Sequence, residues 1–207
     1  MMISHCLAIV ENDKKNLCLC FAVCRPPSAG SSSGQTQPYY RFALHADELK
    51  KLENCTVVEG NLEIIWMFTS VSKDNYTDLV FPNLLEITGY LLLYRVDGLE
   101  TIGQLFPNLR VIGGRWSFYD GLVLVLYENS DLVSLSLANV EYIGGDVLAM
   151  VNPQLCYIDN HVDWKRVIST GRDPITLENK KRAGCDLFDG CDGCKNCWDR
   201  KSCQPSK

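Results

Sequence analysis

The chain has 207 residues, of which 46% are hydrophobic and 22% are charged, and its 20 basic and 25 acidic side chains give a net charge of −5. This length accommodates one sizeable hydrophobic core with a small satellite module, and the hydrophobic fraction excludes a disordered chain. The mildly acidic balance argues against a nucleic-acid-binding protein, and no apolar run approaches the roughly 18 residues that span a bilayer, so we expect no direct membrane insertion.

The first 38 residues differ from the rest in composition. A pair of lysines precedes the apolar run Leu17–Cys24, and a stretch rich in Pro, Ser and Gly follows it. This order of basic, apolar and small residues is typical of a signal peptide, with Ala22 and Cys24 at candidate cleavage positions. We predict a signal peptide and flexible leader over residues 1–38, with a disordered tail as the alternative.

A motif of the form Asn-Φ-x-x-Φ-x-Gly, in which Φ is apolar or Cys, recurs four times between residues 54 and 145. The copies are Asn54–Gly60, Asn83–Gly89, Asn108–Gly114 and Asn139–Gly145. Each copy precedes a run of β-forming residues. These runs are Leu62–Phe68, Tyr90–Val96, Leu122–Tyr127 and Val147–Val151.

The motif has a direct structural interpretation as one coil of a repeat. The two Φ residues of a strand point into a core, Gly permits a corner with positive φ, and Asn bonds backbone groups at the preceding turn. A single coil cannot bury its own apolar edge, so successive coils must stack. We predict stacked β coils over residues 39–178, closed by helices at Leu44–Leu52 and Asp163–Ile168. A generic β-sandwich is the alternative.

The 11 cysteines are distributed unevenly: four lie in residues 6–24, six in residues 156–203, and Cys55 stands alone. Asn54-Cys55-Thr56 and Asn75-Tyr76-Thr77 fit the N-glycosylation pattern, which makes Asn54 and Asn75 candidate glycan acceptors. Clustered cysteines beside such sequons indicate an oxidising compartment, so we expect an extracellular, secreted chain.

The distal end, residues 179–207, is short and rich in cysteine, so it needs cross-links rather than a core. The spacing Cys191-x2-Cys194-x2-Cys197-x5-Cys203 suits disulfides or a metal site, because thiolates at CxxC spacing bind zinc or iron–sulfur clusters. This single cluster contains no histidine and has no separate second CxxC pair, which favours disulfides. A metal-binding protein remains the alternative.

Several stretches occur in the order and spacing of one known family. They are Leu52–Leu62 (LENCTVVEGNL), Tyr90–Val96 (YLLLYRV), Leu105–Gly114 (LFPNLRVIGG), Leu155–Ile158 (LCYI) and Cys197-Trp198. The chain resembles the insulin receptor and insulin-like growth factor receptor family, specifically its first receptor L domain and the start of the furin-like cysteine-rich region. The resemblance implies a mainly β fold, a right-handed β-helix with short capping helices and a small disulfide-rich tail.

The resemblance also implies a disulfide pattern. The implied pairs are Cys156–Cys185, Cys191–Cys197 and Cys194–Cys203. The family has a further cysteine before its first coil, and residues 37–43 (QPYYRFA) lack it, so we expect Cys55 to be without its usual partner. Signal cleavage after Ala22 would spare Cys24 for a bridge to Cys55. Cleavage after Cys24 would leave Cys55 available for a disulfide-linked dimer.

In the resembling family, one flat sheet binds an insulin-like peptide hormone. The corresponding positions here are Ile65, Trp66, Phe68, Tyr94, Arg95, Phe118 and Tyr119. Exposed aromatic side chains beside an arginine are typical of protein–protein hot spots. Because alternate residues of a strand face inward, a core position is the alternative for each. The last coil, Leu148–Val151 (LAMV), is more apolar than the family's charged counterpart.

The family's intracellular tyrosine kinase has no counterpart in this sequence, which lacks a glycine-rich phosphate loop, an HRD-type catalytic loop and a DFG motif. We therefore expect no enzymatic activity and no cofactor. The first interpretation is a kinase-less, secreted binder of an insulin-like peptide that acts as a decoy. The alternative is an N-terminal ectodomain fragment of a membrane receptor tyrosine kinase.

Overall fold

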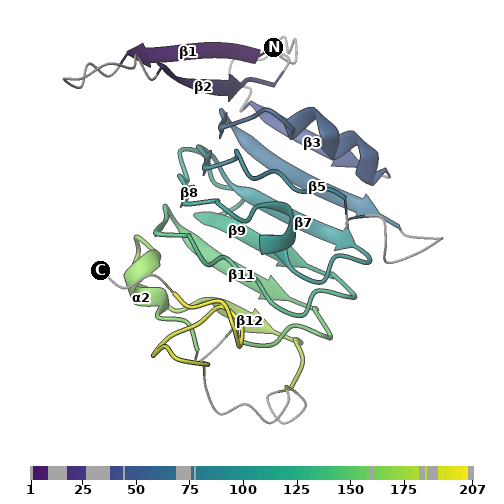
Figure 1. The fold of residues 1–207 in the computed structure, drawn as a ribbon. Coiled ribbons are helices and arrows are strands. Elements are labelled where there is room, and N and C mark those ends of the chain that lie inside the picture. Colours follow the sequence, from purple (N-terminus) through teal and green to yellow (C-terminus); the bar gives the residue numbers. More distant parts are fainter. Residues whose placement is uncertain are drawn as a thin grey trace.

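The computed structural model describes residues 2–8, 18–26, 38–43, 45–68, 76, 78–158, 161–181, 185 and 191–204, with backbone only at 2–8 and 18–21. Two six-stranded sheets run along the molecule (Figure 1). All neighbouring strands are parallel except the first pair, which is antiparallel. The expectation of a mainly β fold with few helices is confirmed.

Sheet A consists of mostly short strands in the order β1-β2-β4-β6-β8-β10. Their bounds are Met2–Ala8 (β1), Cys18–Cys24 (β2), Val57–Val58 (β4), Glu86–Ile87 (β6), Val111–Ile112 (β8) and Tyr142–Ile143 (β10). Sheet B has the order β12-β11-β9-β7-β5-β3. Its strands are Tyr39–Ala43 (β3), Asn61–Met67 (β5), Leu91–Val96 (β7), Leu122–Tyr127 (β9), Asp146–Met150 (β11) and Ile175–Leu177 (β12).

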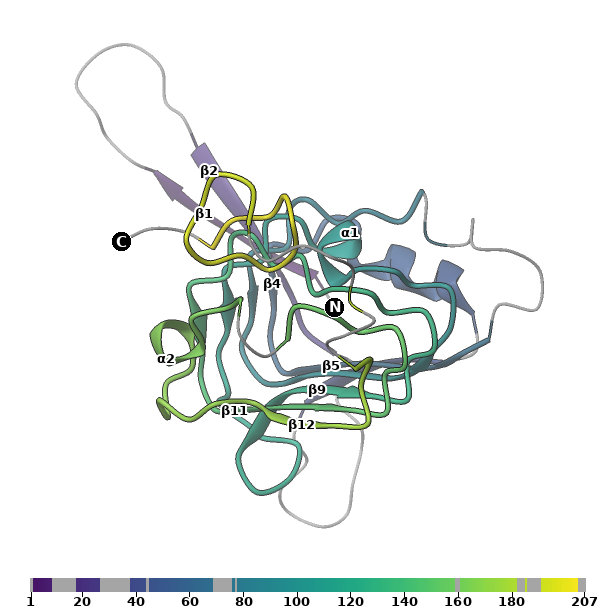
Figure 2. The same ribbon diagram turned by 90° about the horizontal axis from the view of Figure 1, so that it is seen from below.

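The predicted repeats become coils of a stack. Each copy of the motif supplies a strand of sheet A, and the β run after it supplies the next strand of sheet B. Figure 2, seen along the stack, shows the coils superposed into one outline with the two sheets on different sides. The parallel pairing follows from this course, because each coil returns to the start of the next in the same direction.

Three short helices accompany the coils. They are η1 (Ala46–Leu52, a 3-10 helix), α1 (Ile102–Leu105) and α2 (Trp164–Val167). Leu49 and Leu52 of η1 are fully buried at the first coil, and Trp164 and Val167 of α2 are buried at the far end of the core. Both predicted helical segments therefore exist, in shorter form.

The core lies between the two sheets and is filled by alternate residues of each strand. On sheet B, inward positions such as Leu62, Leu93 and Leu126 belong to one continuous buried cluster, together with Ile87 and Ile112 of sheet A. The period of two in β strands explains why single residues of each apolar run enter the core while their neighbours face outward.

The glycines that end the four motifs act by two different mechanisms. Gly60 and Gly114 have positive φ values of 115° and 68°, as the corner prediction requires. Gly89 does not have a positive φ: a Cβ there would lie 2.0 Å from Asn61 Oδ1. Gly145 likewise is required by contact, since a Cβ would lie 2.5 Å from the Gly121 carbonyl oxygen. The prediction of a positive-φ corner is wrong for these two, where close packing of adjacent coils selects glycine.

Two sets of asparagines connect successive coils. As expected for the motif, Asn108 and Asn139 donate from Nδ2 to the carbonyl oxygens of Pro82 and Pro107, at 2.9 and 2.8 Å. A second set, Asn129, Asn152 and Asn179, follows the strands of sheet B and was not predicted. Asn152 Oδ1 accepts from the backbone N–H of Asn129 at 3.1 Å, and Asn179 Oδ1 accepts from the backbone N–H of Asn152 at 3.1 Å.

Of the two outcomes predicted for Cys55, the structure contains the bridge to Cys24. Cys24 and Cys55 form a disulfide, with a Cα–Cα distance of 5.6 Å. Strand β2 pairs in parallel with β4, matching Val23 to Val57, and this register brings Cys24 beside the end of η1. Because both sulfurs are used within the chain, Cys55 has no thiol for a disulfide-linked dimer.

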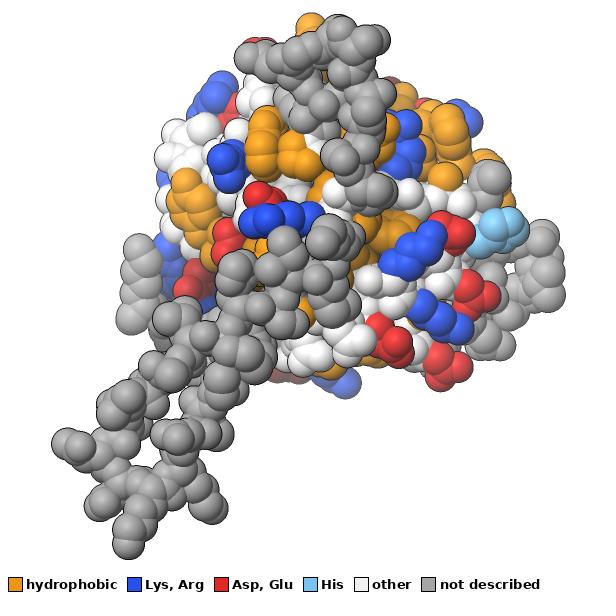
Figure 3. All heavy atoms as spheres, turned by 90° about the horizontal axis from the view of Figure 1, so that it is seen from above, with side chains coloured by type: hydrophobic (Ala, Val, Ile, Leu, Met, Phe, Trp, Pro, Cys, Tyr) orange, Lys and Arg blue, Asp and Glu red, His pale blue; other side chains and the backbone are white. Residues whose placement is uncertain are grey.

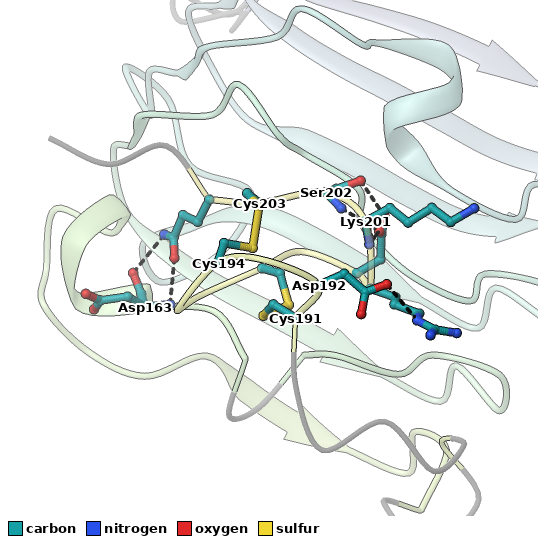
Figure 4. The surroundings of a disulfide bond; sticks show 11 residues. Asp163, Cys191, Asp192, Cys194, Lys201, Ser202 and Cys203 are labelled. Carbon is teal, nitrogen blue, oxygen red and sulfur yellow. Dashed lines mark hydrogen bonds and ion pairs between the residues drawn. A yellow bond between two sulfur atoms is a disulfide. The ribbon is translucent and has the colours of Figure 1, made fainter.

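The distal cysteines form disulfides packed against the last coil (Figure 4). The pairs are Cys156–Cys185, Cys191–Cys197 and Cys194–Cys203, as the family resemblance implies. Trp198 packs edge-on against Trp164 of α2 at 5.3 Å, and the Gln204 side chain exchanges two hydrogen bonds with the backbone of Asp163. These sulfurs are therefore engaged in disulfides and not available as thiolates for the metal-binding alternative.

Candidate functional site

The outward face of sheet B carries two rows of side chains that cross the strands in register. The first row is Arg41, Glu63, Leu92, Val125, Leu148 and Ile175. The second row is Ala43, Ile65, Tyr94, Tyr127, Met150 and Leu177. Because parallel strands keep register, each row is a straight line of neighbours across the six strands.

The centre of this face forms an apolar cluster separate from the core. Its buried members are Ile65, Tyr90, Leu92 and Val125, and Tyr94, Leu122 and Leu148 pack against them. The strands of sheet B are thus apolar on both sides, which accounts for runs such as Leu91–Leu93 that lack polar alternation. Ile65, a predicted contact residue, is only 6% exposed because it fills this outer cluster.

A ladder of left-handed residues lies at the end of the sheet B strands. Its members are Trp66, Arg95, Glu128, Val151 and Glu178, all with φ between 51° and 58°. A residue in this conformation interrupts the alternation of the strand. Consecutive predicted residues, such as Ile65 and Trp66, therefore do not alternate between face and core, and Trp66 remains 43% exposed.

Aromatic rings continue from this ladder across three strands. The Trp66 and Tyr94 rings are 6.1 Å apart, and the Tyr94 ring stacks on Tyr127 at 5.4 Å. Tyr94 is consequently half-buried, whereas Phe68, just beyond β5, is 55% exposed. The sequence placed Trp66, Phe68 and Tyr94 together, and the structure brings Trp66 and Tyr94 into contact.

One polar group stands at the β3 edge of the face. Glu63 is almost fully buried, accepts a hydrogen bond from the Tyr90 hydroxyl, and pairs with Arg41 Nε at 2.5 Å. Burial, followed by this bond to Glu63, raises the pKa of Tyr90, and the bond to Glu63 raises the pKa of Arg41. The half-exposed Arg41 guanidinium also lies over the Tyr39 ring at 5.0 Å. This corner therefore presents a cation to solvent above a neutralised buried carboxylate.

A second arginine occupies the end of β7. Arg95 is exposed, pairs with Glu128, and lies over the Tyr94 ring at 5.2 Å. Hydrogen bonds from Arg95 and then Tyr127 lower the pKa of Glu128, so this carboxylate stays ionised at neutral pH. Arg95 and Arg41 thus flank the apolar centre as two Arg-on-Tyr pairs, a combination suited to protein recognition.

The remaining predicted residues lie on the loop between β8 and β9. Phe118 packs edge-on against Tyr90 at 5.6 Å, while Tyr119 is 75% exposed. The loop projects beyond sheet B in the view along the stack (Figure 2). Its base is closed by hydrogen bonds between Phe118 and Leu122 and between Leu122 and Tyr119. Phe118 therefore contacts the outer apolar cluster through Tyr90, and Tyr119 lies at the margin of the predicted contact set.

Ile175 and Leu177 were not predicted to belong to the face, whereas Leu148 and Met150 lie in the apolar last coil that the sequence analysis assigned to it. Leu148 and Met150 are half-buried, and Ile175 and Leu177 of β12 are more than half exposed. Tyr127 and Glu128 complete the contacts of Tyr94 and Arg95. The alternation of apolar residues in Asp146–Met150 was the available signal, but only the register of the sheet shows that they extend the same rows.

Other surfaces carry a different chemistry. Seen from the amino-terminal end, positive and negative side chains alternate with hydrophobic ones (Figure 3). In the part of the chain that the structure describes, no group of three or more His, Cys, Asp or Glu is placed to hold a metal ion. None of the helices in the described residues has the length and apolar character that crossing a membrane requires.

Comparison with known proteins identifies relatives. The receptor L domain family matches residues 54–168. The chain is 41% identical over 160 residues to a putative molluscan insulin-related peptide(s) receptor of Lymnaea stagnalis. This alignment covers 76% of this chain and 10% of the relative. It is 38% identical over 167 residues to an insulin-like peptide receptor of Branchiostoma lanceolatum and 34% identical over 200 residues to the insulin-like growth factor 1 receptor of Xenopus laevis. These alignments cover 75% and 88% of this chain, and 12% and 14% of the relatives.

Proposed function

This chain belongs to the receptor L domain family, and on that premise we propose that it binds an insulin-like peptide outside the cell, on the outward face of sheet B. The names of its relatives support the ligand class, since they are receptors for insulin-related or insulin-like peptides. The chain spans about a tenth of the length of these relatives, so the proposal concerns one domain.

The observation that carries the proposal is the outer apolar cluster with its aromatic margin. Trp66 and Phe68 expose large rings beside the buried cluster, and Arg41 and Arg95 stand at its borders. Large aromatic side chains remove extensive area from water at low entropic cost, and arginine adds directional hydrogen bonds. Exposed apolar side chains that gather on one face, here Trp66, Phe68, Ile175 and Leu177, are typical of a protein-interaction surface.

The contact set predicted from the sequence is retained in this proposal and extended. Ile65, Trp66, Phe68, Tyr94 and Arg95 line the central strands, and Phe118 and Tyr119 form one margin. We add Leu148, Met150, Ile175 and Leu177, which continue the two rows onto β11 and β12. The last coil, Leu148–Val151, is apolar where the family's counterpart is charged. The preferred peptide therefore carries a longer apolar stripe.

The proposal includes the finer architecture and the domain limits. We propose that the coils form a right-handed β-helix over residues 39–178, preceded by a signal peptide and leader in residues 1–38 and followed by the start of a cysteine-rich module in 179–207. The Cys24–Cys55 disulfide favours signal cleavage after Ala22 over cleavage after Cys24, because only the former retains both sulfurs. Asn54 and Asn75 are the proposed glycan acceptors, and Asn75 lies outside the residues that the structure describes.

Two settings share this binding face: a secreted chain without a kinase that competes for the peptide, and the ligand-binding end of a membrane receptor tyrosine kinase. Mapping the end of the transcript separates them, since a natural stop after Lys207 supports the secreted form. In neither setting does this domain catalyse a reaction, so robust phosphotransfer by the purified chain would contradict the proposal.

The test of the site is titration of a labelled insulin-like peptide onto the purified, disulfide-bonded chain. Phe68→Ala should cost about 1–3 kcal/mol of binding free energy, an increase in Kd of roughly 5- to 150-fold, with an unchanged melting temperature. Tyr142→Ala is the matched control, because Tyr142 is 44% exposed on β10 of sheet A. Undiminished binding by folded Phe68→Ala would remove this assignment.

A further inference from the structure

The Asn54 sequon combines an accessible acceptor with two immobilised neighbours. Asn54 is exposed between η1 and β4, whereas Cys55 is fully buried in its disulfide with Cys24. The third residue, Thr56, leads directly into β4, whose Val57 and Val58 pair with Val23 and Cys24, and Glu59 donates its backbone N–H to the Cys24 carbonyl oxygen at 2.9 Å. The segment that carries Cys24 thus also holds the chain that follows the threonine.

The next coil adds a second constraint on the same tripeptide. The Thr56 carbonyl oxygen accepts backbone hydrogen bonds from Leu85 at 2.8 Å and from Glu86 at 3.3 Å. Thr56 is therefore bonded to the coil that follows it in sheet A. Its backbone cannot leave these partners unless the next coil separates from it.

N-glycosylation needs all three residues at once. The Asn Nδ2 forms a bond to the first sugar, loses a proton, and displaces the lipid pyrophosphate to which the sugar was attached, while the transferase reads the hydroxyl of the third residue. An exposed acceptor alone does not meet this requirement. In the folded chain, Cys55 and Thr56 cannot enter a transferase together with Asn54.

We propose that glycan transfer to Asn54 and closure of the Cys24–Cys55 disulfide compete, and that transfer takes place only before closure. Closure joins two thiols into one disulfide, and the two electrons and two protons pass to a disulfide-bearing oxidoreductase of the secretory route, whose own disulfide becomes two thiols. A glycan already on Asn54 projects into solvent and leaves Cys55 free to pair afterwards. This inference rests on the extracellular route in the proposed function.

The position of the glycan is compatible with the binding face. Asn54 precedes β4 of sheet A, whereas the proposed peptide contacts lie on sheet B. Occupied and unoccupied chains therefore differ in the bulk attached near β4 and share the same ligand surface. The competition thus produces two glycoforms with one binding site.

The experiment measures occupancy of Asn54 by mass spectrometry in the full chain expressed in a secretory cell, with a reporter sequon added after Lys207. Cys24→Ser, or a reductant pulse during synthesis, should raise the occupied fraction at Asn54 above that of the wild type. Cys194→Ser is the matched control, because it removes the disulfide to Cys203 and should leave Asn54 occupancy unchanged. The measurement of Asn54 occupancy does not require that a variant fold, since under this proposal glycan transfer precedes folding.

The possible results separate the two proposals. Equal occupancy of Asn54 in wild type, Cys24→Ser and reductant-treated chains, with the reporter sequon occupied, would overturn the competition alone. An unoccupied reporter in every condition would overturn the extracellular route and this inference with it. As a second measurement, oxidised and reduced purified chains are offered to oligosaccharyltransferase with a lipid-linked donor. Only the reduced chain should accept glycan at Asn54, and modification of the oxidised chain would contradict the proposal.

Discussion

Asn152→Ala tests whether the buried asparagine ladder holds the coils together. The Asn152 side chain is fully buried, and its Oδ1 accepts from Asn129 N–H and Nδ2 at 3.1 and 3.0 Å. Its Nδ2 donates to the Leu126 and Met150 carbonyl oxygens, both at 3.1 Å. Alanine removes these partners and leaves at least the Asn129 N–H and the Leu126 carbonyl without protein partners in a buried site. At about 1–3 kcal/mol for each orphaned group, the loss should be about 2–6 kcal/mol.

The matched control is Asn139→Ala, which removes an asparagine with a similar coil-to-coil bond on the surface. Asn139 is exposed, and water replaces its 2.8 Å bond to the Pro107 carbonyl oxygen, so the loss should stay below about 1 kcal/mol. The assay is urea unfolding of the disulfide-intact chain, followed by circular dichroism. Equal losses in the two variants, or a loss below 1 kcal/mol for Asn152→Ala, would refute the reasoning.

Three further predictions concern backbone, packing and pH. Val151→Gly should be more stable than Val151→Ala by about 1 kcal/mol in urea unfolding, because the φ of 58° strains a residue that carries a Cβ. Gly89→Ala should lower the unfolding free energy by about 1–3 kcal/mol, since its Cβ would meet Asn61 Oδ1 at 2.0 Å, and an unchanged value would contradict the packing argument. Burial raises the pKa of Asp199, but hydrogen bonds led by that from Ser136 outweigh it and leave the pKa below its ordinary value. The stability from Asp199 is therefore present above its unfolded-state pKa and is lost as pH falls through its folded-state pKa. Asp199→Asn should remove this part of the acid-induced fall in melting temperature, and an identical pH profile would exclude it.

The stacking of coils was predictable because it depends on spacing alone. Four motifs, each followed by a β run, require the chain to return to the same two sheets. The reason for Gly89 was not predictable, because the atom that excludes a side chain is Asn61 Oδ1 of the preceding coil. The partner of Cys55 was predictable only as one of two alternatives, because the sequence made a bridge to Cys24 depend on the site of signal cleavage. The pairing of β2 with β4 brings Cys24 to Cys55 across a separation of 31 residues.

The candidate face was predictable in part. Large aromatic residues after each corner identified Trp66, Phe68 and Tyr94, but runs such as Leu91–Leu93 contain no polar residue that marks the outer side. The outer cluster becomes visible only when register aligns Leu92 with Val125. Sequence alternation also fails at Trp66, where a left-handed residue within β5 keeps two successive side chains off the core.

The two-sided burial of sheet B determines how a partner would bind. Ile65, Leu92 and Val125 are already packed against one another without a ligand, and Tyr94 is held between Trp66 and Tyr127. The face is therefore ordered before association, so a peptide would lose conformational entropy mainly on its own side. The exposed rings at the margin, Trp66 and Phe68, then supply the area newly removed from water. The buried centre holds these exposed rings in fixed positions. The repeat of the sequence thereby produces a flat, pre-organised surface.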